Sequence, residues 1–171
     1  MILYTDRLLL RPWEPSDSKE LFELARNPQI GNACGWQPHR TEEDSKEIIK
    51  TVLSAPQTYA IVSKTTGRLL GSIGLLIGQK SNLTLSENQC EIGFWVGVPY
   101  WGQGFAPEAV NALLQYAFSK LNMEKVWCIS LADNTNSSRV QQKCGFKFKY
   151  STNELNISNQ KTVCVSVISK E

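Results

Sequence analysis

Residues 89–109 combine three features that constrain the fold more than any other part of the chain. A run typical of a strand, residues 89–98, leads into a turn that contains Gly102 and Gly104. The turn opens directly into a predicted helix over 105–121. The apolar residues of this helix recur at three- and four-residue spacing: Ala106, Val110, Leu113, Ala117 and Leu121. A strand, a tight turn and an amphipathic helix in direct succession predict an α/β domain.

The turn over residues 102–106 has the construction of an anion-binding site. Glycines allow the backbone to turn tightly and to approach a ligand closely. The first N–H groups of a helix have no partner inside it, and the helix dipole adds partial positive charge there. Pro107 fits in the first turn, because it removes an N–H that would be unpaired anyway. We therefore expect this turn to hold a phosphate or a pyrophosphate.

Two familiar phosphate-binding motifs do not fit. A nucleoside triphosphate loop needs Gly-Lys-Ser or Gly-Lys-Thr, and neither occurs in the sequence. A dinucleotide-binding turn needs Gly-x-Gly-x-x-Gly near the first strand, but Pro107 stands where the last glycine would be. For the Gly-x-Gly turn taken alone, a tight connection without a ligand remains the alternative.

The remaining chain alternates strands and helices without repeats or linkers. Further strands are predicted at 7–11, 58–63, 69–76, 126–131, 146–150 and 162–168. Other helices are predicted from a cap at Ser16 to Asn27, from a capping box at Thr41 and Asp44, and over 134–144 before Gly145, with a loop at 31–40. This order predicts a single α/β (α+β) domain over residues 1–171. Its mixed, mostly antiparallel sheet would have about six to seven strands and helices on both faces.

Composition excludes several classes of protein. The chain has 171 residues with a net charge of +2, and its pI of about 8.3 is too low for a dedicated nucleic-acid binder. The five cysteines are odd in number and form no Cys-x-x-Cys pair, so we expect reduced thiols and no metal. The charged start and the lack of an apolar run of about 20 residues favour a cytoplasmic protein without a membrane span.

Four segments in order resemble the GNAT superfamily of N-acetyltransferases. They are residues 5–11, 91–95, 100–109 and the run from Asn134 to Phe146. The resemblance is greatest to the RimJ/RimL-type branch, the ribosomal-protein-alanine acetyltransferase-like proteins. It implies a GNAT-like domain, acetyl-CoA as co-substrate, an amine acceptor and no metal. Trp101 departs from the glutamine or arginine that usually opens the glycine motif, whereas Gly104 and Ala106 match it.

The resemblance assigns cofactor contacts residue by residue. Backbone N–H groups of the turn would hold the CoA pyrophosphate, the preceding strand would run beside the pantetheine arm, and the Asn134 motif would complete the site. The predicted cofactor-binding residues are Phe94, Trp95, Val96, Trp101, Gly102, Gln103, Gly104, Phe105, Ala106, Asn134 and Ser137.

The resemblance also implies direct transfer within a ternary complex, without an acyl-enzyme. Glu91 is the leading candidate for the catalytic base, because a desolvated carboxylate beside aromatic residues gains a raised pKa; bracing of the sheet is the alternative. Ser137 is the candidate acid, because Gln141 stands where many relatives have tyrosine. The alternative is that Ser137 only forms hydrogen bonds with backbone groups at the start of the helix. Trp36 and His39 are predicted substrate contacts, with a packed loop as the alternative.

The acceptor predicted first is the N-terminal amine of a protein or peptide. The alternatives are a small-molecule amine, such as a polyamine, amino acid or aminoglycoside, and a non-catalytic acyl-CoA-binding module. No nucleic acid or membrane partner is expected. The chain could act as a monomer or as a homodimer joined through its last strand. The sequence does not decide whether Cys34 is reactive.

Overall fold

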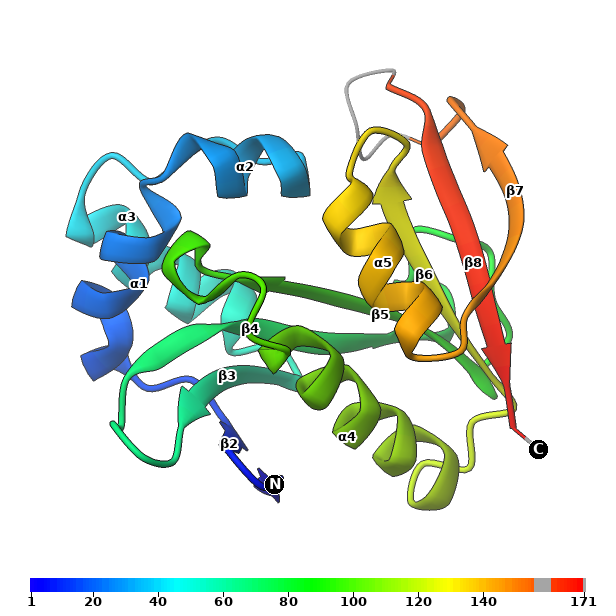
Figure 1. The fold of residues 1–171 in the computed structure, drawn as a ribbon, viewed down its shortest axis with the longest axis horizontal. Helices are drawn as coiled ribbons and strands as arrows, with labels where there is room; N and C mark the ends of the chain where they lie inside the picture. The colour runs from blue at the N-terminus through cyan, green and yellow to red at the C-terminus, as the bar shows by residue number, and fades with distance from the viewer. Residues whose placement is uncertain (156–160, 171) are drawn as a thin grey trace. The chain divides into compact units, whose positions relative to one another are not determined.

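The computed structural model describes residues 1–155 and 161–170, which group into two compact units. Residues 1–74 and 94–112 form the first unit, and the described parts of 75–93 and 113–171 form the second. Figure 1 follows the chain through both. The single domain over residues 1–171 stays a prediction.

The described residues form eight strands in one mixed, mostly antiparallel sheet, which confirms the predicted architecture. In sheet order the strands are β1 (Leu3–Tyr4), β2 (Leu8–Arg11), β3 (Thr58–Ser63), β4 (Leu69–Ile77), β5 (Gln89–Val96), β6 (Lys125–Leu131), β8 (Val163–Ser169) and β7 (Lys147–Thr152). The pairing of β5 with β6 is parallel. β1 was not predicted from the sequence, because only two residues pair there with Leu9 and Leu10.

Five α-helices occur among the described residues: α1 (Ser18–Ala25), α2 (Pro28–Cys34), α3 (Glu42–Ile48), α4 (Phe105–Ser119) and α5 (Thr135–Lys143). The expected loop over 31–40 was wrong in its first part, which belongs to α2. The Asn27 side chain accepts the Gln29 N–H at 3.0 Å, so Asn27 and Pro28 begin a helix instead of ending one. Ser16, the predicted cap, lies inside the short 3-10 helix Pro15–Asp17 that precedes α1.

In the first unit, α1 packs against α3 and buries its apolar face on β3 (Figure 1). The core cluster contains Trp13, Leu21, Leu24, Ala25, Ile49, Ala60, Val62 and Leu69. The end of β5 approaches this core closely, because the Gly97 N–H donates to the Leu70 carbonyl at 2.8 Å. This packing fixes the place from which the glycine turn departs.

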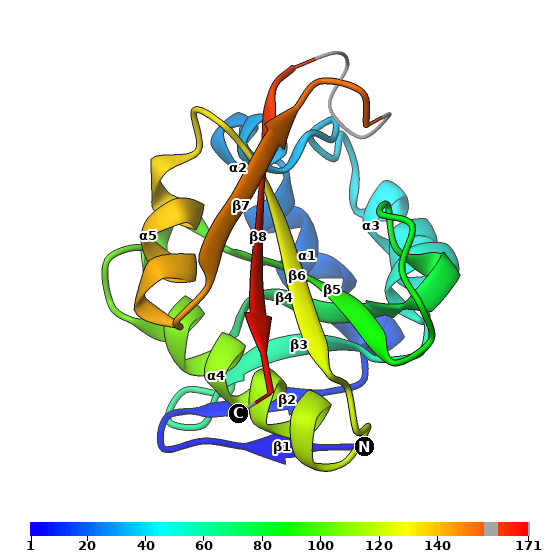
Figure 2. The same ribbon diagram turned by 90° about the vertical axis from the view of Figure 1, so that its right-hand side faces the viewer.

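In the second unit, β6, β8 and β7 lie side by side, with α5 packed against β6 (Figure 2). Seven residue pairs join β6 to β8, from Lys125–Ser169 to Leu131–Val163. The parallel ladder between β5 and β6 is much shorter, since it starts at Gln89–Lys125 and ends at Ile92–Cys128.

Candidate active site

The predicted glycine turn lies between the 3-10 helix Val98–Tyr100 and the first residue of α4, Phe105. Gly102 and Gly104 adopt φ values of 75° and 81°, in the left-handed region that glycine enters without strain. The predicted start of the helix is confirmed. The strand expected to reach residue 98 ends at Val96, because Gly97 and Pro99 turn the chain there.

Two side chains of this segment donate to backbone carbonyl groups that precede the turn. The Trp101 indole N–H donates to the Val96 carbonyl at 2.6 Å, and the Gln103 side-chain amide donates to the Pro99 carbonyl at 3.0 Å. Trp101, the departure from the family motif, thus ties the turn to the end of β5.

The N–H groups of the turn, by contrast, are unpaired. In the described chain, those of Gly102, Gln103 and Gly104 donate to no other residue. Those of Phe105 and Ala106 belong to the first turn of α4, where no intrahelical acceptor exists. A run of backbone donors at the positive end of a helix is suited to an anion. Which ligand it binds stays a prediction.

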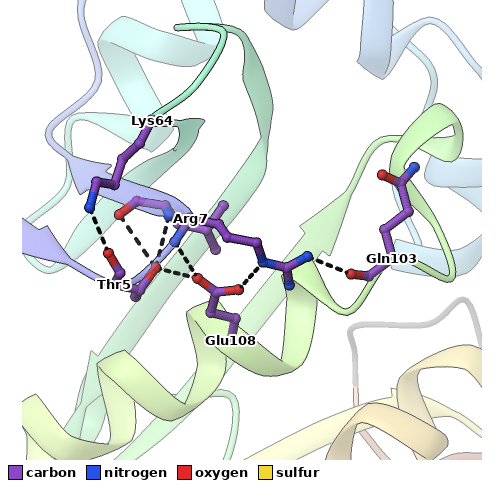
Figure 3. Close-up of polar contacts among 6 residues, drawn as sticks. Thr5, Arg7, Lys64, Gln103 and Glu108 are labelled. Atoms are coloured by element: carbon purple, nitrogen blue, oxygen red, sulfur yellow. Dashed lines mark hydrogen bonds and ion pairs between the residues drawn. The ribbon is translucent and has the colours of Figure 1, made fainter.

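Glu108, in the first turn of α4, joins residues distant in sequence (Figure 3). Its carboxylate accepts hydrogen bonds from the Thr5 hydroxyl at 2.5 Å, the Arg7 backbone N–H at 2.9 Å and Arg7 Nε at 2.6 Å. Partial burial raises the pKa of Glu108, but these bonds outweigh it, so the pKa lies below its usual value. Residues 5–11 match the family motif in the sequence, but no signal along the chain links them to Glu108.

Glu91 is buried, and both of its carboxylate oxygens are engaged. Its Oε2 accepts from the Ser81 hydroxyl and the Asn82 backbone N–H, each at 2.8 Å, and its Oε1 accepts from Asn82 Nδ2 at 3.0 Å. These bonds hold residues 81–83 onto β5. The geometry favours the bracing alternative for Glu91 over the role of base, because each of its oxygens already accepts a hydrogen bond.

We expect Glu91→Gln to lower the free energy of unfolding by about 2 kcal/mol, because the new amide turns a donor toward groups that donate. The rate constant kcat should stay within about tenfold of the wild-type value, since general-base catalysis contributes roughly 100-fold or more. Urea unfolding and initial rates measure both quantities. Glu124→Gln, at an exposed position of the same unit, is the matched control. A fall in kcat beyond 100-fold with unchanged stability would restore Glu91 as the base.

Asn134 and Ser137 lie together at the start of α5. The Asn134 side chain accepts the Ser137 backbone N–H at 3.0 Å, which caps the helix. The buried Gln141 amide donates to Ser137 Oγ at 3.2 Å. In the described chain the Ser137 hydroxyl donates to no other residue, so its hydrogen remains available for a ligand.

Trp36 and His39 lie beside each other, and Trp36 also contacts Trp95 of β5. The ring centroids of Trp36 are 5.5 Å from those of His39 and 6.1 Å from those of Trp95. His39 Nδ1 is paired with the Ser45 hydroxyl at 2.8 Å. Burial lowers the pKa of His39, and this effect exceeds that of the negative charge of Asp44, which raises the pKa. The ring is therefore neutral at pH 7. Trp36, a predicted contact of the acceptor, therefore packs against Trp95, a predicted contact of the cofactor.

Burial also raises the pKa of the Cys34 thiol to about 12, against a hydrogen bond from Trp36 that lowers it. We expect iodoacetamide at pH 7.5 to alkylate Cys34 at least about 100-fold more slowly in the native protein than in urea, because the thiolate is the reacting species. Mass spectrometry of the Cys34 peptide after timed labelling measures this ratio. Equal rates in both states would show that Cys34 is a reactive thiol.

No group of three or more metal-binding side chains occurs in the described residues. Among the same residues, no helix is long and apolar enough to cross a membrane.

The mixed sheet and the donor-lined turn before α4 agree with the fold and the phosphate-binding turn expected of an acyltransferase of the N-acetyltransferase class. The sequence profile described as "Acetyltransferase (GNAT) domain" matches residues 7–147. The chain therefore belongs to the GNAT acetyltransferase family, whose members use acetyl-CoA.

Two relatives and two solved structures illustrate the likeness. YoaA of Bacillus subtilis, named an uncharacterised N-acetyltransferase, is 28% identical over 151 residues, or 85% of this chain and 82% of the relative. YdaF of the same organism, provisionally named a ribosomal N-acetyltransferase, is 28% identical over 146 residues, or 82% and 78%.

Among solved structures, a GNAT-family acetyltransferase from Bacillus anthracis has a TM-score of 0.85 at 22% identity, covering 99% of this chain and 98% of that one. Spermidine N-acetyltransferase from Vibrio cholerae, in complex with CoA and spermine, has a TM-score of 0.76 at 19% identity, covering 96% of each chain. At these identities the likeness shows the fold.

Proposed function

We propose that this enzyme transfers the acetyl group of acetyl-CoA to the N-terminal amine of a protein or peptide. The observation that supports acetyl-CoA as the acyl donor is the run of unpaired N–H groups over residues 102–106 at the start of α4. Pyrophosphate is the anionic group of CoA that we expect such a run to hold. Phe94, Trp95 and Val96 would lie beside the pantetheine arm, because they form the last part of β5, directly before the turn. Asn134 and Ser137 stay predicted contacts of the cofactor.

The proposed chemistry is a direct transfer. The amine nitrogen forms a bond to the thioester carbon, the C–S bond breaks, the amine loses a proton to a base and the CoA thiolate takes one up. A backbone N–H near Val96 would stabilise the tetrahedral oxyanion. Ser137 would supply the proton to sulfur. His39 takes the place of Glu91 as candidate base, because Nε2 of its neutral ring has no partner in the described chain.

The acceptor region favours a peptide amine over a polyamine. A polycation would be held by open carboxylates, but the acidic residues at the start of α3 are occupied. Glu42 accepts from Ser18 at 2.8 Å, Glu43 pairs with Lys46 at 3.1 Å, and Asp44 accepts the Thr41 N–H at 3.0 Å. Aromatic rings gather instead around Trp36. YdaF supports this choice by its name, whereas the Vibrio cholerae enzyme keeps the polyamine as the second candidate.

The test combines calorimetry of acetyl-CoA binding with release of free CoA in the presence of different amines. The panel contains short peptides with free N-termini, the same peptides with acetylated N-termini, polyamines and aminoglycosides. We expect CoA release only with free N-termini. Release with spermidine alone would replace the acceptor by a polyamine. Binding without release in the whole panel would favour the acyl-CoA-binding module, and absence of binding would overturn the donor.

A further inference from the structure

Glu108 creates an electrostatic problem for the proposed site. Its carboxylate lies in the first turn of α4, next to the donors that would hold a pyrophosphate. A negative charge at a helix start is favourable by itself, but it repels a second anion bound at the same end. A side chain that neutralises Glu108 is therefore needed before a pyrophosphate can bind tightly.

Arg7 supplies that neutralisation. Its Nε and its backbone N–H both donate to the carboxylate of Glu108, at 2.6 and 2.9 Å. The guanidinium also lies 4.5 Å from the ring centre of Phe105, the first residue of α4, which holds it against the helix start. Figure 3 shows this arrangement, with Arg7 reaching from the N-terminal segment to both the helix and the turn.

Arg7 also sets the orientation of one peptide group in the turn. Its Nη1 donates to the Gln103 carbonyl at 2.9 Å. In a trans peptide the C=O and the following N–H point in opposite directions, and no cis peptide occurs in the described chain. A Gln103 carbonyl directed at Arg7 therefore directs the Gly104 N–H away from Arg7.

We propose that Arg7 is a positioning residue for acetyl-CoA: one guanidinium neutralises Glu108 and holds the Gln103 carbonyl, so that the Gly104 N–H faces the pyrophosphate. This inference rests on the proposed function, because it gives the turn a pyrophosphate to bind. It assigns Arg7 an effect on donor affinity and none on the acyl-transfer step.

The alternative is that these bonds only tether the N-terminal segment to α4. Two variants separate the roles. Thr5→Val removes one bond to Glu108 and the bond to the Leu8 N–H, so it weakens the tether and leaves the guanidinium in place. Arg68→Gln breaks an exposed ion pair with Glu20 at 2.9 Å in the same unit, and it controls for loss of a surface charge.

The experiment measures Kd for acetyl-CoA by calorimetry, together with KM, kcat and urea unfolding. We expect Arg7→Gln to raise Kd and KM for acetyl-CoA about tenfold, with kcat within twofold of wild type. Arg7→Lys, which keeps the charge and most of the stem, should stay at least fivefold weaker, because an ammonium lacks the second planar donor. Thr5→Val should lower stability but change Kd less than threefold, and Arg68→Gln should leave Kd unchanged.

Dephospho-CoA completes the test, because it keeps the pyrophosphate and lacks the 3′-phosphate. The loss in Arg7→Gln should be equal for CoA and dephospho-CoA. A loss seen only with CoA would mean that Arg7 binds the 3′-phosphate, which overturns the proposal. A Kd within twofold of wild type in folded Arg7→Gln also overturns it. If the wild-type protein binds neither ligand, the proposed function fails and this inference fails with it.

Discussion

Gly104→Val should remain folded and lose at least about 100-fold in affinity for acetyl-CoA. Gly104 adopts a φ of 81°, where a β-branched residue is strongly strained. The turn must rearrange to relieve this strain, which redirects the N–H groups of residues 102–104. Charge-assisted hydrogen bonds are worth about 1.5–3 kcal/mol each, and the loss of two of them corresponds to about 100-fold or more in Kd. Calorimetry of acetyl-CoA binding measures the effect.

Gly67→Val is the matched control for this prediction. Gly67 has a φ of 69°, and a Cβ there would meet no other atom within 4 Å, so the backbone strain is similar. It lies in the connection between β3 and β4, outside the turn over residues 102–106. The control should lose a similar amount of stability and keep its affinity for acetyl-CoA. Unchanged affinity in folded Gly104→Val would show that the turn does not bind the cofactor.

Gly71→Ala should destabilise the protein by at least about 3 kcal/mol, a large part of the 5–15 kcal/mol typical of a whole domain. A Cβ on Gly71 would collide with the carbonyl oxygen of Trp95 and would lie 2.8 Å from the Cα of Val96. These are backbone atoms of β5 and cannot move aside as a side chain could. The midpoint of urea unfolding and the yield of soluble protein measure the loss.

Substitutions at two other glycines should cause smaller losses of stability than Gly71→Ala. A Cβ on Gly97 would meet the flexible end of Leu24 at 2.6 Å, so Gly97→Ala should cost less than Gly71→Ala. A Cβ on Gly93, within β5, would meet nothing within 4 Å, so Gly93→Ala should be neutral or slightly stabilising. Equal losses at Gly71 and Gly93 would contradict the role assigned to the contact between β4 and β5.

Local sequence patterns correctly predicted the features that depend only on residues close together in the chain. The capping box is confirmed, because Thr41 Oγ1 accepts the Asp44 N–H at 3.1 Å. Gly145 follows α5 at a φ of 86°, as a glycine after a helix should. The start of α4 was predicted for the same reason, whereas the mixed sheet was predicted from the order of the elements along the chain.

Other local signals were read in the wrong direction. Asn27 and Pro28 fit the end of one helix and the beginning of the next, and only the bond between Asn27 and the Gln29 N–H decides for α2. The two residues of β1 carry no strand pattern of their own and become a strand by pairing with β2.

The sequence by itself determined the glycine turn before α4, because backbone freedom and helix propensity are properties of neighbouring residues. The tertiary structure alone decided which hydrogen-bond and ion-pair partners the charged groups have. Glu91 resembles a desolvated base in the sequence, yet Ser81 and Asn82, ten and nine residues away, donate hydrogen bonds to its carboxylate. Glu108 finds its partner Arg7 a hundred and one residues away. The charge and availability of a carboxylate depend on the donors that the folded chain brings to it, and no spacing along the sequence reveals them.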